Sequence, residues 1–226
     1  MRPTAKVIAL SLLAYSLISI DATAQYTQTN DMEGRAVHEY NTISMDGSPY
    51  LHPDWATGSI SLSNGITYQG ISIMYDQVKD VIIFKTKNNQ VKELIEPVQE
   101  FSISYIKDNQ KVEKTFRKGY SSEEISPNTF LEVIAQGKHT MLKKTSKNLF
   151  DRKNYSSATI NREVQESSDY YIATNNKLVK VKKSKSSLLS VLSGETGNLE
   201  VYIKKNSLNL RNEEDIAKLV AYSNSL

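Results

Sequence analysis

The feature that most constrains the fold of this chain is a succession of short apolar–polar alternations between residues 48 and 183, separated by turn signals. Side chains point alternately to the two faces of a strand, so a period of two predicts half-buried β-strands. Asn64-Gly65 is a strong hairpin signal, and Asn175-Asn176 is a further turn signal. About nine or ten strands at intervals of about 8–12 residues predict a long antiparallel meander, in the form of a curled sheet or a partly closed barrel.

The periodicity changes at Ser184, and residues 184–226 show helical spacing instead. Ile216 and Leu219 fall on one apolar stripe of a helix. Asn212 comes directly before three acidic residues, which is the composition of a helix N-cap and first turn. We therefore predict two or three short C-terminal helices that pack on the open face or end of the sheet. The fold class is mainly β (α+β).

The first residues of the chain have the pattern of a secretory signal peptide. A basic start leads into an apolar stretch from Val7 to Ile20, followed by the small residues Ala22 and Ala24. The stretch is about fourteen residues long, whereas a membrane-spanning helix needs about 20. We predict that residues 1–24 are removed, so that no transmembrane anchor remains after cleavage. A retained anchor is the alternative.

The absence of cysteine limits the chemistry of the chain. It excludes disulfide scaffolds, thiolate metal sites, cysteine nucleophiles and a lipoprotein anchor. It also favours a bacterial exported protein, located in the periplasm, outside the cell or at its surface. We expect a polar lead-in over residues 25–47, flexible or loosely docked, and a single β-rich domain over residues 48–226.

Aromatic and polar residues near the start of the predicted sheet are candidates for a binding rim. His52, Asp54 and the single tryptophan, Trp55, lie in one short segment, and Tyr68 and Tyr75 lie in predicted strands. The segment could provide a ligand-binding rim or a His–Asp pair. The alternative is a proline turn in which Asp54 binds the backbone and Trp55 closes one end of the core. Tyrosines suit either a sheet face or an aromatic-lined concave cleft.

A dense basic run follows the last predicted hairpin. It is a candidate patch for a polyanion, an anionic lipid headgroup or an acidic partner. The alternative is an edge strand whose lysines block pairing with other chains. Aromatic residues that could stack on bases are missing from the run, so nucleic acid is not expected as a partner. The run comprises Lys177, Lys180, Lys182, Lys183 and Lys185.

Signatures of catalysis, metal binding and cofactor binding are missing. The histidines lack metal-ligand spacing, and no Gly-x-Ser-x-Gly elbow or phosphate-binding glycine loop is present. His139 follows a turn and is predicted to be exposed. We predict no catalytic residue, no metal site and no cofactor.

The order of these features resembles a widespread group of uncharacterised exported proteins of gram-negative bacteria. The resemblance is carried by the signal peptide, the β-rich middle, the lysine-rich strand, the leucine-rich helical end and two motifs. These motifs are Trp55-x-x-Gly58 and Gly65-x-x-Tyr68-x-Gly70-x-x-x-x-Tyr75-Asp76. The group implies no activity, and no site residue is taken from it.

The sequence favours an exported, non-catalytic protein that binds a lipid, a glycan or an envelope protein through a sheet face or the basic strand. One alternative is a structural or accessory component of an envelope assembly. The other is a hydrolase whose site is assembled from distant residues.

Overall fold

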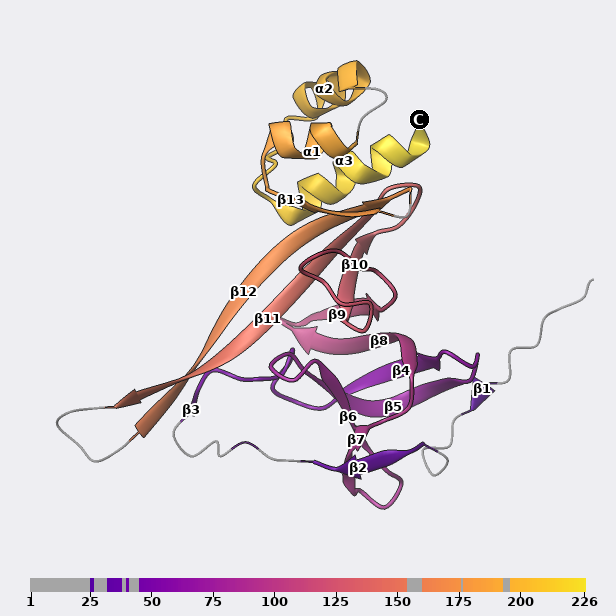
Figure 1. Cartoon of the computed structure of the whole chain (residues 1–226), viewed down its shortest axis with the longest axis vertical. Coiled ribbons are helices and arrows are strands. Elements are labelled where there is room, and N and C mark those ends of the chain that lie inside the picture. Colours follow the sequence, from indigo (N-terminus) through magenta and orange to yellow (C-terminus); the bar gives the residue numbers. More distant parts are fainter. Residues whose placement is uncertain are drawn as a thin grey trace, which may run out of the picture.

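The computed structural model describes residues 25–26, 32–37, 40, 45–153, 160–175, 177–192 and 196–226. The predicted signal peptide, residues 1–24, lies outside the described residues. The prediction of a mainly β fold with short C-terminal helices is confirmed. One mainly antiparallel sheet, which does not close into a barrel, carries three helices at one end (Figure 1).

The strands follow the chain in two groups. The N-terminal strands are β1 (Gln25–Tyr26), β2 (Gly34–Ala36), β3 (Met45–Asp46), β4 (Ala56–Leu62), β5 (Thr67–Asp76), β6 (Val81–Lys85) and β7 (Val91–Leu94). The later strands are β8 (Val98–Lys107), β9 (Gln110–Arg117), β10 (Leu131–Ala135), β11 (Thr140–Lys153), β12 (Ile160–Thr174) and β13 (Lys177–Val181). The helices are α1 (Lys185–Val191), α2 (Thr196–Lys205) and α3 (Glu213–Ser225).

The sheet consists of two meanders that share one central pairing. The strand order is β13-β12-β11-β10-β9-β8-β4-β5-β6-β7-β2, so β8 pairs with β4 instead of β7. Short pieces of the polar lead-in also pair with the sheet: β1 with β5, β2 with β7, and β3 with β12. The first meander (β4 to β7) therefore lies beside the second (β8 to β13). The short strands of the lead-in pair with both meanders.

The first meander and the start of the second curl around an aromatic core. Tyr75 of β5 lies 4.9 Å, centroid to centroid, from Phe116 of β9. These two strands are three positions apart in the sheet, and in a flat sheet that separation would be about 14 Å. The contact therefore requires a strong curl. Phe84, Phe101 and Ile60 also belong to this core, and each is almost fully buried.

The three helices cover the other end of the same sheet. Asn212 caps α3, since its side-chain oxygen accepts a hydrogen bond from the amide of Glu214 at 3.0 Å. Ile216 and Leu219 of α3 pack with Met141 of β11 in a second core. None of the described helices is long and apolar enough to cross a membrane.

The loop between β9 and β10 covers the opposite face of the sheet at this end. Its Ile125 packs against Leu131, Leu142 and Tyr171, which belong to three adjacent strands. The second meander is thus sandwiched between helices on one face and a loop on the other, and this arrangement holds the hairpin turns at its end.

Strands β11 and β12 form a long two-stranded ribbon that projects beyond the rest of the sheet (Figure 1). Their register is unbroken from the pair Thr140–Ala173 to the pair Lys153–Ile160. The sequence predicted shorter strands here, because the distal part is polar. Cross-strand ion pairs, such as Arg162 with Asp151 at 2.6 Å, stand in place of an apolar face.

We expect Gly58→Ala to destabilise the curl. A Cβ at Gly58 would lie 2.2 Å from the Cδ1 atom of Ile73 and 2.7 Å from the carbonyl oxygen of Ser102. Relief needs a backbone shift, which costs about 1–3 kcal/mol of unfolding free energy. Gly197→Ala is the matched control, because its Cβ would meet nothing within 4 Å. Chemical denaturation measures both, and equal stabilities would contradict the expected crowding.

Candidate functional site

Tyr68 and Tyr75 do not form the rim suggested by the sequence. They are 3% and 1% exposed, and both belong to the core inside the curl. Because the curl places one face of the sheet against itself, these rings fill the concave side. The concave face is therefore packed by the protein's own side chains, and a ligand cleft lined by these tyrosines is not present there.

His52, Asp54 and Trp55 lie in a local turn. The Nδ1 atom of His52 contacts the backbone of Asp54, 3.2 Å from its amide nitrogen, and not its carboxylate. The His52 ring stacks on Tyr105 at 4.5 Å, and Lys85 lies 4.4 Å above the Trp55 ring. A turn is present, as in the alternative interpretation, but the His52 ring binds the backbone of Asp54 instead of the Asp54 side chain binding the backbone. Trp55 is only half-buried instead of closing the core.

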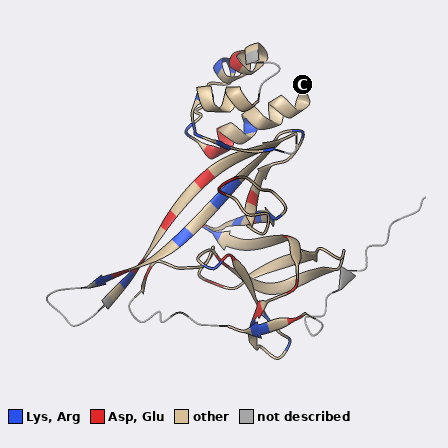
Figure 2. Ribbon diagram, in the orientation of Figure 1, with Lys and Arg blue, Asp and Glu red and all other residues tan. Residues whose placement is uncertain are grey.

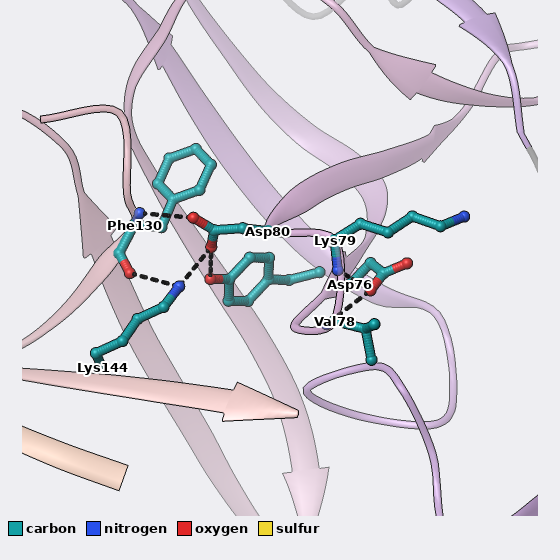
Figure 3. A network of polar contacts seen from close by, with 7 residues as sticks. Asp76, Val78, Lys79, Asp80, Phe130 and Lys144 are labelled. Carbon is teal, nitrogen blue, oxygen red and sulfur yellow. Dashed lines mark hydrogen bonds and ion pairs between the residues drawn. The ribbon is translucent and has the colours of Figure 1, made fainter. Parts of the chain in front are cut away.

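A polar network joins the β5–β6 turn to β11 (Figure 3). The carboxylate of Asp80 accepts hydrogen bonds from the Nζ atom of Lys144 at 2.8 Å and from the amide of Phe130 at 3.2 Å. It also accepts one from the hydroxyl of Tyr75. Burial is the main cause that raises the pKa of this phenol, so Tyr75 stays a hydrogen-bond donor. Each group in the network has a partner, which is typical of a structural contact.

Asp76 and Lys147 extend the same junction. Asp76 is fully buried and accepts hydrogen bonds from the amides of Val78 and Lys79, both at 2.9 Å, which shape the turn. The Nζ atom of Lys147 donates to the carbonyl oxygen of Ser48 at 3.0 Å. Burial lowers the pKa of Lys147, so its charge costs free energy that these carbonyl contacts offset. The sequence did not predict this junction, because its members lie far apart in the chain.

The predicted basic run lies along the edge strand β13 and the start of α1. Three of its five lysines have partners. Lys180 pairs with Glu124 at 2.8 Å and Asp169 at 3.2 Å, which raises its pKa. Lys183 lies 4.4 Å above the ring of Tyr170, and Lys185 pairs with Glu200 at 2.8 Å. Lys177 and Lys182 pair with no acidic group among the described residues.

A polar cleft of about 450 Å³ lies at the end of the second meander. We call it the turn cleft, because the β10–β11 turn, the β12–β13 turn and the start of the β9–β10 loop surround it. Lys138 and Lys177 enter it from the two turns, and neither forms an ion pair with a described acidic residue. Its lining is Gly119, Tyr120, Ser121, Gly137, Lys138, Thr140, Ala173, Thr174, Asn175, Lys177 and Leu178.

An unsatisfied polar atom also belongs to the turn cleft. The Oγ1 atom of Thr174 is buried and has no hydrogen-bond partner among the described residues. Buried hydroxyls in proteins are generally paired, so this oxygen, which solvent does not reach, is an exception in the wall of the cleft. Tyr120, half-buried, adds an aromatic wall.

A second cleft, of about 510 Å³, lies beside β13 near α1. It contains Lys180, Lys182 and Lys183 of the predicted run. Two of these three already interact with protein groups, with acids in one case and with the Tyr170 ring in the other. A larger share of its lysines therefore already interacts with protein groups than in the turn cleft.

His139 lies beside Lys138, and its predicted exposure is wrong. The residue is 6% exposed, because α3 packs over the β10–β11 hairpin. Asn224 of α3 accepts a hydrogen bond from the amide of His139 at 2.7 Å and donates one to its carbonyl at 2.9 Å. Burial first, and then the charge of Lys138, lowers the pKa of the imidazole. The position after a turn gave no hint of the covering helix.

Comparisons of the chain with protein-family models, curated proteins and solved structures give no match. Within the described part of the chain, no group of three or more His, Asp or Glu side chains could hold a metal ion. Among the described residues, the turn cleft brings together two lysines that have no acidic partner.

We expect Asp80→Asn to lower the unfolding free energy by about 1–3 kcal/mol, because it leaves the half-buried Lys144 ammonium without a counter-charge. Asn keeps the size of the side chain and tolerates the positive φ of 60° at this position. Asp151→Asn removes an exposed ion pair and should cost less than about 1 kcal/mol. Urea denaturation of both variants tests the difference, which an equal loss would refute.

The buried imidazole of His139 should make stability fall as the pH falls. Its pKa is lowered in the folded state, so below about pH 6.5 the unfolded chain binds more protons and is favoured. We expect His139→Leu to lose less stability than the parent between pH 7.5 and pH 5. The hydrogen bonds of Asn224 involve the backbone and remain. Thermal unfolding across this range measures the difference, and parallel curves would contradict the assignment.

Proposed function

We propose that this chain is an exported, non-catalytic protein that binds a negatively charged ligand in the turn cleft. The observation that carries the proposal is the meeting of Lys138 and Lys177, two lysines without described acidic partners, at one polar cleft. Two ammonium groups around one concavity attract an anion, and they form charge-assisted hydrogen bonds with carboxylate or phosphate oxygens.

The other groups of the cleft support a ligand that also has neutral polar groups. Ser121 and Asn175 line the cleft with a hydroxyl and an amide side chain, and the Tyr120 ring offers an apolar surface. A lipid headgroup or an acidic sugar presents this combination of an anion beside hydroxyl groups. The shared chemistry is a phosphate or carboxylate with adjacent hydroxyls.

Export is supported by the sequence pattern of residues 1–24 and by the lack of cysteine. The compartment is consistent with lipid and glycan ligands, and it makes nucleic acid an unsuitable partner. A hydrolase has no comparable support, since His52 contacts the backbone of Asp54 and not its carboxylate.

The test is a binding experiment with defined probes. Calorimetry measures the binding of inorganic phosphate, glucuronate, and vesicles of phosphatidylglycerol in phosphatidylcholine to the mature chain. We expect one probe class to bind, and Lys138→Ala combined with Lys177→Ala to weaken it at least about tenfold. A preference for vesicles indicates a lipid headgroup, and a preference for glucuronate indicates a glycan.

The matched control is Lys87→Ala, which removes an exposed lysine from the distant β6–β7 turn. It should leave the affinity unchanged. If the control weakens binding as much as the double variant, the attraction is a general charge effect and the turn cleft is not the site. Failure of all three probes to bind would likewise overturn the proposal.

A further inference from the structure

The distal half of β11 has an open backbone edge. The pairing of β10 with β11 ends at Lys143. Further along, the amide of Lys147 donates a hydrogen bond to the carbonyl oxygen of Gln77 at 3.3 Å. From Asn148 to Arg152, no described element pairs with this edge. The other side of the ribbon is partly covered, because β3 pairs with β12. Figure 1 shows that the ribbon projects away from the sheet, so the edge is accessible.

Other edges of the sheet have the usual protection against pairing. The β13 edge carries Lys177 and Lys180, and β2 is only three residues long. Lysines and short length both discourage the addition of a further strand.

The edge of β11 lacks such protection. Asp151 and Arg152 form ion pairs within the ribbon: Asp151 pairs with Arg162, and Arg152 pairs with Glu163, both of β12. Figure 2 shows basic residues along β11 facing acidic residues along β12. Phe150 directly precedes Asp151 in β11 and is 47% exposed. An unprotected edge beside an exposed aromatic ring is the arrangement that accepts another strand.

The backbone groups of this edge are arranged symmetrically about Phe150. The amide of Lys147 points away from β12, so those of Leu149 and Asp151 point outward as well, at a period of two. In an antiparallel pair, Leu149 of one copy would exchange both hydrogen bonds with Asp151 of the other. Phe150 would lie opposite its own copy, and Asn148 would lie opposite Arg152 without a clash of like charges.

We propose that the β11 edge from Asn148 to Arg152 pairs with the same edge of a second copy of this chain. The contact is isologous, with a two-fold axis at Phe150, and it joins the two sheets into one. The paired segment is five residues long, because the β5–β6 turn occupies the edge at Lys147. Such a short ladder gives a reversible dimer.

A cysteine at position 150 tests the register, because the chain has no other cysteine. At the proposed axis the two Cα atoms lie about 4.5 Å apart, within the range that a disulfide spans. We expect mild oxidation of Phe150→Cys to produce a disulfide-linked dimer on a non-reducing gel. Val201→Cys, at a residue of α2 that is 65% exposed, is the collision control and should crosslink several-fold less.

Sedimentation of the unmodified chain and of two variants at Asp151 tests the backbone pairing. Asp151→Pro removes the outward amide but none that faces β12, and it should be monomeric. Asp151→Ala keeps the amide and loses only the ion pair with Arg162, so it should dimerise like the parent. A parent that stays monomeric at all concentrations, a proline variant that still dimerises, or crosslinking no greater than that of the control would each overturn the proposal.

Discussion

The docking of the β5–β6 turn against β11 is the contact on which the arrangement of the two meanders depends. Among the described strands, only the pairing of β4 with β8 joins the two meanders directly, and a single ladder leaves the angle between them adjustable. Lys144 and Lys147 contribute two ammonium groups, which bind the Asp80 carboxylate of the β5–β6 turn and the carbonyl of Ser48 in the segment before β4. Because these groups are largely buried, losing one partner leaves an uncompensated charge or dipole. The junction therefore fixes the curl.

That fixed geometry has consequences at the far end of the sheet. The helices and the β9–β10 loop grip the second meander from both faces, and Asn224 binds the backbone on both sides of the β10–β11 turn. The same turn supplies Lys138 to the turn cleft. The cleft thus stands on two hairpin turns whose strands are held rigidly, which is how a binding site gains preorganisation.

Local patterns predicted the parts of the fold that depend on neighbours in sequence. The alternation around Ile60 and Ile73, the hairpin at Asn64-Gly65 and the cap at Asn212 all follow from short-range rules. The length of the ribbon did not follow, because its strands are held by cross-strand ion pairs that only the register reveals. Likewise, the burial of Tyr68 and Tyr75 depends on the curl, and the burial of His139 depends on α3.

The candidate site was predictable only in part. The lysine run drew attention to β13, and Lys177 does reach the turn cleft. Lys138 stood alone in the sequence, and only the meeting of two hairpin turns places it near Lys177. The pairing of the lysine charges could not be predicted either, since Glu124 lies 56 positions from Lys180, and which acids meet Lys180 and Lys185 depends on the fold.

The contact between Lys147 and Ser48 joins residues that are 99 positions apart. A ribosome releases the chain from its N-terminus, so the β5–β6 turn is complete long before its lysine partners exist. During that interval the second meander is missing, so the apolar face of the first meander is uncovered and β4 has no β8 to pair with. High contact order of this kind slows folding and lengthens the exposure of unpaired edges. The long-range junction thus belongs to the late contacts of folding, since it can form only after β11 has been synthesised.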